Sequence, residues 1–190
     1  MMAPMLRTLR ASRACAAVLA AGLAAITGTQ AMPAEPAAGV DLSRFGGRWY
    51  VIARAPQPAA PGVGAYFEYK PRPDGRLDEL FSSRTGSFEA APVTTERTVR
   101  TDPQQPAKWS VKTGWFSSDE EWLLYVSADY REAIAGTPGG KSGWILAREP
   151  VIPEWTYAGL VARLAMQGYD VSRFRRVAQT PDQVGRPGFE

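Results

Sequence analysis

The sequence predicts an all-β fold, an eight-stranded up-and-down antiparallel β-barrel with one C-terminal α-helix packed on its outside. Eight short segments of strand-like composition follow one another at regular spacing, separated by turns rich in Gly, Pro and Asp. Helical periodicity occurs only after the last of these segments. Eight strands are also enough for a closed barrel that holds one small ligand.

The N-terminal segment predicts an export signal. Three arginines precede a small apolar run over 14–26, and small residues follow at 29–31, an order typical of a cleaved secretory signal peptide. The run is shorter than the ~20 residues that span a bilayer. We therefore expect a signal peptide over 1–31 and a mature protein, not lipidated, in the periplasm or outside the cell. The lone Cys15 lies inside the signal, so no disulfide is expected.

Charge and composition exclude several functions. Removing the signal lowers the basic count from 22 to 19, equal to the 19 acidic residues, which gives no support for nucleic-acid binding. The chain has no histidine, which excludes Ser-His-Asp and Cys-His catalysis and imidazole-bound zinc. A metal would need oxygen ligands, for which Asp119, Glu120 and Glu121 are a candidate calcium cluster, although a solvated hairpin turn is the simpler interpretation. We expect no metal and no cofactor.

The elements follow in order. A flexible Pro/Ala-rich tail is expected over 32–40, and the barrel domain over 41–180. In the fifth strand Trp109 and Val111 alternate with polar residues, which indicates a half-buried strand. The eight strands are expected at 48–55, 64–70, 76–84, 93–101, 108–115, 121–128, 131–136 and 142–148.

The C-terminal part predicts one helix and a disordered end. Apolar residues recur at helical spacing over 153–167, which indicates a helix packed on the barrel, and Gly168 is expected to end it. Residues 181–190 are expected to be disordered. The run 135–142 fits a relaxed phosphate-loop pattern, but a strand-like segment follows it where a helix would be needed, so no nucleotide binding is expected.

Three short motifs resemble those of the lipocalin family. The run Gly-Arg-Trp-Tyr at 47–50 is similar to the first motif, Asp-Tyr at 129–130 to the second, and the arginine after the apolar run 144–147 to the third. Their order and separations match across about 41–180, and the branch they resemble most is that of bacterial lipocalins and apolipoprotein D. The residues that the resemblance implies to be structural are Gly47, Trp49, Tyr50, Asp129, Tyr130 and Arg148.

The resemblance implies a specific geometry. Arg148 would lie across the Trp49 ring at the closed end of the barrel, in a cation–π contact supported by hydrogen bonds to backbone. The loop 56–64 would cover the open end, and its three prolines indicate a stiff cap. Two features common in relatives, a lipid-attached cysteine and disulfides, are missing from the expected mature sequence.

Strand alternation predicts an aromatic lumen with few charges. If Trp49 and Arg148 mark the inward-facing side, Ala53 also faces inward, with a larger set of candidate ligand contacts. These candidates are Trp144, Tyr69, Trp109, Val111, Leu146, Val51, Phe67 and Tyr125. Each could instead pack the barrel, since small barrels can be filled by their own side chains. An apolar pocket of this kind suits a fatty acid, a lysophospholipid or an isoprenoid.

The sequence therefore predicts an exported, non-catalytic carrier of a small hydrophobic molecule, with no nucleic-acid partner. One alternative is an enzyme of the same fold that uses a single inward carboxylate of raised pKa. Glu68, Asp78 and Glu79 lie on strands, but the adjacent pair must point to opposite faces and cannot work together. The other alternative is a ligand-free envelope interaction module with a filled barrel, of which peripheral membrane contact is a variant.

Overall fold

The computed structural model describes residues 33–55, 62–112 and 117–190. The expected signal peptide and residues 56–61 of the expected loop at the mouth lie outside the described residues. Met32, the first residue of the expected tail, and positions 113–115 of the fifth expected strand lie outside them as well.

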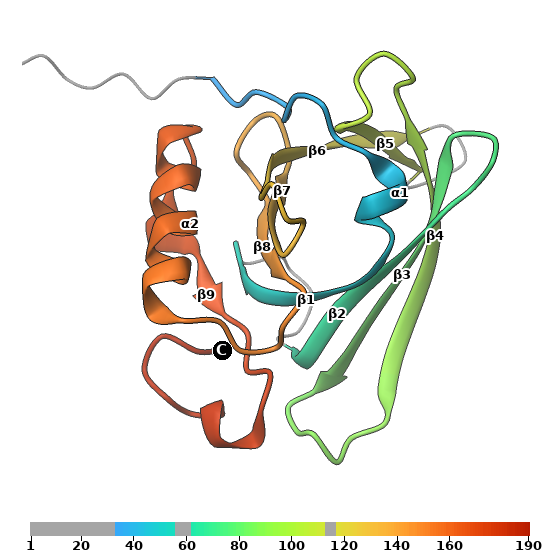
Figure 1. The fold of residues 1–190 in the computed structure, drawn as a ribbon. Helices are drawn as coiled ribbons and strands as arrows, with labels where there is room; N and C mark the ends of the chain where they lie inside the picture. The colour runs from blue at the N-terminus through green and yellow to red at the C-terminus, as the bar shows by residue number, and fades with distance from the viewer. Residues whose placement is uncertain (1–32, 56–61, 113–116) are drawn as a thin grey trace, which may run out of the picture. The chain divides into compact units, whose positions relative to one another are not determined.

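The described chain confirms the predicted fold class, a closed antiparallel barrel with a helix near the C-terminus (Figure 1). Each strand pairs with its neighbours in sequence, and β1 pairs with both β8 and β2, which closes the barrel. The strands are β1 Gly47–Arg54, β2 Gly62–Pro71, β3 Arg76–Thr85, β4 Pro92–Thr101, β5 Lys108–Lys112, β6 Ser118–Val126, β7 Glu132–Gly136 and β8 Gly143–Ala147.

The short helix α1 (Leu42–Phe45), which was not predicted from the sequence, closes one end of the barrel. The Asp41 carboxylate caps it by accepting a hydrogen bond from the Ser43 amide at 2.8 Å. Phe45, at the end of α1, is fully buried and stacks on Trp49 with ring centroids 4.6 Å apart. The helix thus places an aromatic side chain in the floor of the lumen.

Buried side chains form two groups on opposite sides of the barrel wall. The lumen cluster consists of Val40, Phe45, Trp49, Val51, Ala65, Phe67, Tyr69, Leu77, Val99, Ala107, Trp109, Val111, Leu123, Ala133, Ala135, Leu146 and Val177. The outer cluster consists of Ile52, Ala53, Ala55, Leu124, Ile134, Ile145, Ala147, Ile152, Leu160, Leu164, Tyr169 and Phe174. Strands β1, β6, β7 and β8 contribute to both groups.

A β-bulge in β1 reverses the side that its residues face. The pairing of β1 with β8 shifts register between Val51 and Ala53. Val51 packs in the lumen cluster, whereas Ile52 and Ala53 both pack in the outer cluster. The expectation that Ala53 faces the lumen is therefore wrong, because the extra residue interrupts the alternation on which it depends.

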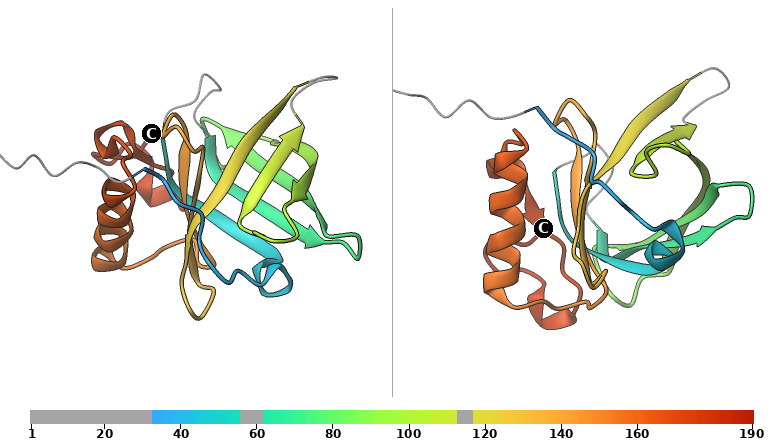
Figure 2. Two further views of the ribbon diagram at one scale, coloured as in Figure 1. Left: turned by 90° about the horizontal axis from the view of Figure 1, so that it is seen from above. Right: turned by 45° about the horizontal axis from the view of Figure 1, so that its top comes forward.

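The helix α2 (Glu154–Met166) lies outside the barrel, as predicted (Figures 1 and 2). Its buried residues, Leu160 and Leu164, pack in the outer cluster, while Trp155 is 77% exposed and does not share that contact. Gly168 ends the helix in the left-handed region at φ 82°, where glycine is favoured. Within the described part of the chain, no helix has both the length and the apolar character needed to cross a membrane.

The segment before α1 is held against the barrel, so the prediction of a flexible tail over 32–40 is wrong for its described residues. The Ala37 amide donates to the Leu123 carbonyl oxygen at 2.7 Å, and the Glu35 amide donates to the Gln167 side chain at 2.8 Å. Val40 is buried in the lumen cluster. Backbone hydrogen bonds to two separate elements explain the order of this segment.

The C-terminal segment is also ordered, which contradicts the expectation of a disordered end over 181–190. After the short helical turn η1 (Val171–Arg173), strand β9 (Arg175–Arg176) pairs with the end of β1, and a second turn, η2 (Pro181–Gln183), follows. Glu190 forms an ion pair with Arg54 at 2.8 Å, and both side chains are largely buried. Composition alone did not show this, because the partners of the segment are distant in sequence.

Deleting residues 186–190 is therefore expected to lower the free energy of unfolding by about 1–3 kcal/mol, since it removes the Glu190 ion pair and the bridge from Phe189 to Arg176. Urea denaturation followed by circular dichroism measures the change. Arg186→Ala, which removes an exposed pair with Asp182, is the control and should cost less than ~0.5 kcal/mol. An unchanged midpoint for the deletion would show that the segment contributes no stability.

Candidate functional site

Arg148 closes the end of the barrel opposite the mouth. Its guanidinium lies 3.9 Å from the centre of the Trp49 ring, as the family resemblance implies. It also donates to four backbone oxygens between residues 44 and 48, at 2.8 to 3.1 Å. At Gly47, where φ is 92°, a Cβ would come within 3.3 Å of the Arg148 Nη1, so the close approach requires glycine. These bonds fix α1 and the start of β1.

The second motif, Asp129 and Tyr130, also stabilises the closed end of the barrel. Tyr130, in the left-handed region at φ 59°, accepts a hydrogen bond from the Asp41 amide at 2.7 Å through its hydroxyl. Its backbone oxygen accepts from Arg148 Nε at 3.3 Å, and Asp129 accepts from the Ser127 hydroxyl at 2.7 Å. Tyr50, the last residue of the first motif, packs against the outer cluster. The contacts of the motif residues are thus structural, and a binding site must be sought higher in the lumen.

The floor of the lumen is filled with aromatic rings. Two predicted ligand contacts, Tyr69 and Trp109, lie there with Phe45, and their ring centroids are 5.3 to 5.5 Å apart. The Trp109 indole donates to the Pro106 carbonyl oxygen at 2.9 Å. Both side chains are almost fully buried, so in this structure the rings of both serve as packing in the floor.

The walls above the floor contain most of the other predicted contacts. Val51, Val111 and Leu146 are buried in the lumen cluster. Phe67 meets Trp144 edge to face at 6.1 Å and contacts Phe81 at 4.9 Å. Phe81 was not predicted as a ligand contact. Side chains alternate along the third strand, so Phe81 points to the same lumen side as Leu77. Ligand contact at these residues stays a prediction.

The predicted lumen position of Tyr125 is wrong. A register shift between Leu123 and Tyr125 in the pairing of β6 with β7 moves Tyr125 to the outside, against the outer cluster. There the guanidinium of Arg163, on α2, lies 4.3 Å from the centre of its ring. Tyr125 therefore helps to hold α2 on the barrel.

The mouth of the barrel retains open space. A cavity of about 240 Å³ lies beside the ends of β2, β3 and β4. Phe81 belongs to its lining and also packs against the lumen cluster, which links the cavity to the apolar walls. The cavity is lined by Arg54, Gly62, Ala65, Phe81, Ser83, Thr85, Val93 and Thr95.

A larger hollow, of about 330 Å³, lies mainly among outward-facing charged side chains of β2, β3 and β4, including Glu68, Lys70, Asp78 and Glu96. Pockets for small apolar molecules are concave and mostly apolar. This hollow is open and charged, so the mouth cavity is the better candidate for an apolar ligand despite its smaller volume.

The lumen contains a polar group that contradicts the expectation of few charges, and we call it the lumen polar group: Tyr69, Glu79, Arg97 and Glu121. Register places Tyr69, Glu79 and Arg97 side by side on β2, β3 and β4, and places Glu121 opposite Trp109 of the floor. Glu79 is 1% exposed and Glu121 5%. Arg97 Nε donates to Glu79 Oε1 at 2.8 Å, and its Nη2 donates to the same oxygen.

Burial controls the ionisation of this group. Burial raises the pKa of Glu121 to about 8, helped by the nearby charge of Glu79 and opposed by Arg97. Burial also raises the pKa of Glu79, against the lowering effect of Arg97. Burial, with the two carboxylates, holds the pKa of Tyr69 well above its usual range. Tyr69 and Glu79 face each other across β2 and β3, and each affects the pKa of the other.

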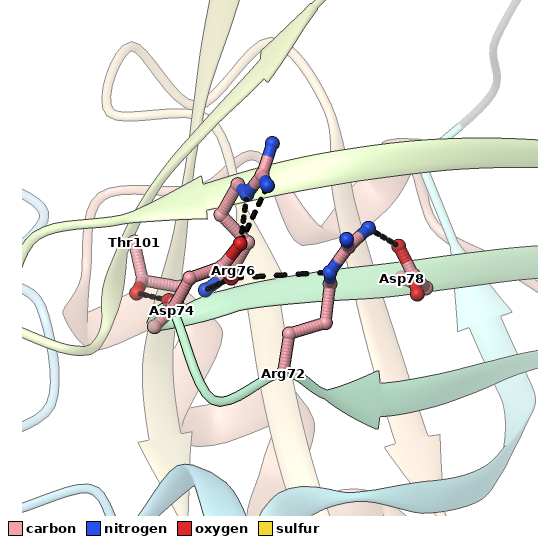
Figure 3. Close-up of polar contacts among 6 residues, drawn as sticks. Arg72, Asp74, Arg76, Asp78 and Thr101 are labelled. Carbon is pink, nitrogen blue, oxygen red and sulfur yellow. Dashed lines mark hydrogen bonds and ion pairs between the residues drawn. The ribbon is translucent and has the colours of Figure 1, made fainter.

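The other carboxylates considered for acid–base chemistry face solvent. Asp78 pairs with Arg72 at 3.1 Å beside the turn between β2 and β3, where Arg76 and Asp74 also pair (Figure 3). Glu68 pairs with Arg48 at 3.4 Å on the outer face. Asp78 and Glu79 do point to opposite faces, and of these two Glu79 lies in the lumen.

The acidic and glycine-rich runs have other roles. Glu121 is buried while Asp119 and Glu120 are exposed, so a solvated turn does not describe Glu121. Among the described residues, no group of three or more His, Cys, Asp or Glu side chains is placed to hold a metal ion. The run 135–142 leads into β8 through a turn in which the Thr137 amide donates to the Ser142 carbonyl oxygen at 3.0 Å.

The fold and its closed end define a lipocalin. The family model described as a lipocalin-like domain matches residues 40–179, and the chain belongs to this family. It is 31% identical over 171 residues to temperature-induced lipocalin-1 of Arabidopsis thaliana, covering 80% of this chain and 86% of that protein. It is 30% identical over 146 residues to a lipocalin of Acanthamoeba polyphaga mimivirus, covering 72% and 83%.

Solved structures share the fold at low identity. Insecticyanin from the tobacco hornworm Manduca sexta matches with a TM-score of 0.61 at 21% identity, over 78% of this chain and 85% of that one. Lobster apocrustacyanin A1 matches with a TM-score of 0.58 at 13% identity, over 74% and 80%. Lipocalins generally bind small hydrophobic ligands and are typically carriers. The likeness to the bacterial and apolipoprotein D branch stays a prediction.

Proposed function

We propose that the protein is an exported, non-catalytic carrier that holds a fatty acid, lysophospholipid or isoprenoid in the barrel lumen. The mouth cavity of about 240 Å³, which shares Phe81 with the apolar walls, carries this proposal. The order of residues in the N-terminal segment supports export to the periplasm or the medium. Burying ~300 Å² of apolar ligand surface contributes about 7 kcal/mol before association costs, which is compatible with micromolar binding.

Thr95→Phe is expected to weaken ligand binding at least tenfold, because a ring at this position would occupy the mouth cavity that Thr95 lines. Thr94→Phe is the matched control, since the neighbouring side chain points to the opposite face of β4 and should leave binding unchanged. Calorimetric titration with palmitate, lysophosphatidylcholine and farnesol measures the affinities. Absence of saturable binding to all three would contradict the carrier function.

An enzyme of the same fold is the second candidate, favoured by one observation, the buried Glu121 with its raised pKa. Mass spectrometry of the ligands recovered from the titrations separates the two functions. A carrier returns each ligand unchanged, whereas an enzyme returns a product whose formation is lost in Glu121→Gln. The open mouth cavity argues against the third candidate, an interaction module with a filled barrel.

A further inference from the structure

Three oxygen atoms of the lumen polar group have no hydrogen-bond partner among the described residues. They are Tyr69 Oη, Glu79 Oε2 and Glu121 Oε1, on side chains that are 1%, 1% and 5% exposed. Buried polar atoms are normally paired, and an unpaired one is costly. Their positions on β2, β3 and β6, around the same aromatic floor, indicate that a donor from outside the described chain completes the group.

The charges of the group point to a cation. The group contains two carboxylates and one guanidinium, and Arg97 Nε and Nη2 both donate to Glu79 Oε1. Among the described residues Glu121 forms no ion pair, although it lies close enough to Glu79 for their charges to interact. When both glutamates are ionised, the group therefore carries one excess negative charge in a water-poor environment, where opposite charges attract strongly.

A primary ammonium matches both requirements. It carries one positive charge and three N–H donors, as the lysine side chain does, and the group offers one excess negative charge and three open oxygens. A hydroxyl brings one donor and no charge, so it would leave oxygens unpaired. A carboxylate would meet two glutamates against a single arginine that is already paired.

We propose that Tyr69, Glu79 and Glu121 form a subsite in the lumen that binds the primary ammonium end of a long-chain amine. The alkyl chain of the amine would follow Phe67 and Phe81 toward the mouth cavity, since these rings contact each other above Tyr69. This subsite rests on the proposed carrier function and names the class of ligand that the lumen selects.

Proton release gives the subsite a distinctive pH dependence. The titratable and charged groups around Glu121 are Tyr69, Glu79, Arg97 and, from the segment after α2, Tyr169. Burial keeps Glu121 largely protonated at pH 7, and the carboxylate must ionise to pair with an ammonium. The affinity for an amine is therefore expected to rise about fivefold between pH 7 and pH 8.

The test compares three chain-matched probes, dodecylamine, dodecanol and dodecanoate, by calorimetry with the purified protein at pH 6, 7 and 8, below the concentration at which each aggregates. We expect dodecylamine to bind at least tenfold more tightly than the other two at pH 8. Glu121→Gln should lose that preference and its pH dependence while keeping its affinity for dodecanol. Glu96→Gln, which alters an exposed side chain beside Arg97 on β4, is the control and should behave as the unmodified protein.

Each other outcome overturns a defined part of the proposal. Equal affinity for the three probes would refute the ammonium subsite and leave the carrier function intact. Preferential binding of dodecanoate, lost in Arg97→Met, would assign the group to an anionic ligand instead. A preference for dodecylamine that persists in both Glu121→Gln and Glu79→Gln would place the cation elsewhere. Binding of none of the probes would contradict the carrier function as well.

Discussion

Replacing Arg148 with methionine is expected to lower the free energy of unfolding by about 3 kcal/mol. Methionine keeps part of the packing against Trp49 but donates no hydrogen bond. The backbone oxygens between residues 44 and 48, and that of Tyr130, would lose the donor that now serves them all. Urea denaturation followed by tryptophan fluorescence measures the loss.

Arg131→Met is the matched control for this substitution. Arg131 lies on the same turn as Tyr130, but its pair with Glu149 is long, at 3.4 Å, and exposed on both sides. Its loss should lower the free energy of unfolding by less than ~0.5 kcal/mol. Equal effects of the two substitutions would mean that Arg148 has no special part in closing the barrel.

The free energy of unfolding is expected to fall as pH rises from about 4.5 to 8, because the fold favours the protonated form of Glu121. In the unfolded chain a glutamate has a pKa near ~4.3, whereas burial raises that of Glu121 to about 8 in the fold. Below the lower value both states hold the proton and the stabilisation is complete. Between the two values ionisation favours the unfolded chain, so stability declines by up to ~1.4 kcal/mol per pH unit and levels off above pH 8.

Glu121→Gln should remove most of this decline, since the amide does not ionise. A smaller dependence of the same sign is expected to remain, because burial also raises the pKa of Glu79. Thermal unfolding at half-unit intervals from pH 5 to 9 measures both curves, with Glu96→Gln as the exposed control. A stability curve that is flat or rising in the unmodified protein would contradict the buried, unpaired state of Glu121.

Local patterns were sufficient to predict the barrel and the helix outside it. Alternation within strands, turn residues between them and one stretch of helical periodicity are properties of short segments. The structure contains the strands, turns and helix that these patterns predict. The contact between Trp49 and Arg148 came from the family resemblance, which supplied a pairing across the chain that spacing alone does not give.

The failures involve features that depend on partners distant in sequence. Bulges at Val51–Ala53 and Leu123–Tyr125 change the face of the sheet toward which the following side chains point. A prediction that assumes strict alternation of side chains cannot detect these bulges. The lumen polar group was missed because Glu121, although it begins the sixth expected strand, was interpreted as part of a solvated acidic cluster, so that its position beside Trp109 was not considered. Order in both terminal segments comes from bonds to Leu123 and Arg54, which composition does not reveal.

The bulge in β1 has a consequence for engineering the protein. Because the second half of this strand turns its apolar side chains toward α2, the described part of the chain has two hydrophobic interiors that share a wall without sharing side chains. Thermal tolerance can then be improved by redesigning the interior beneath the helix, while the interior that contains Glu121 is altered independently.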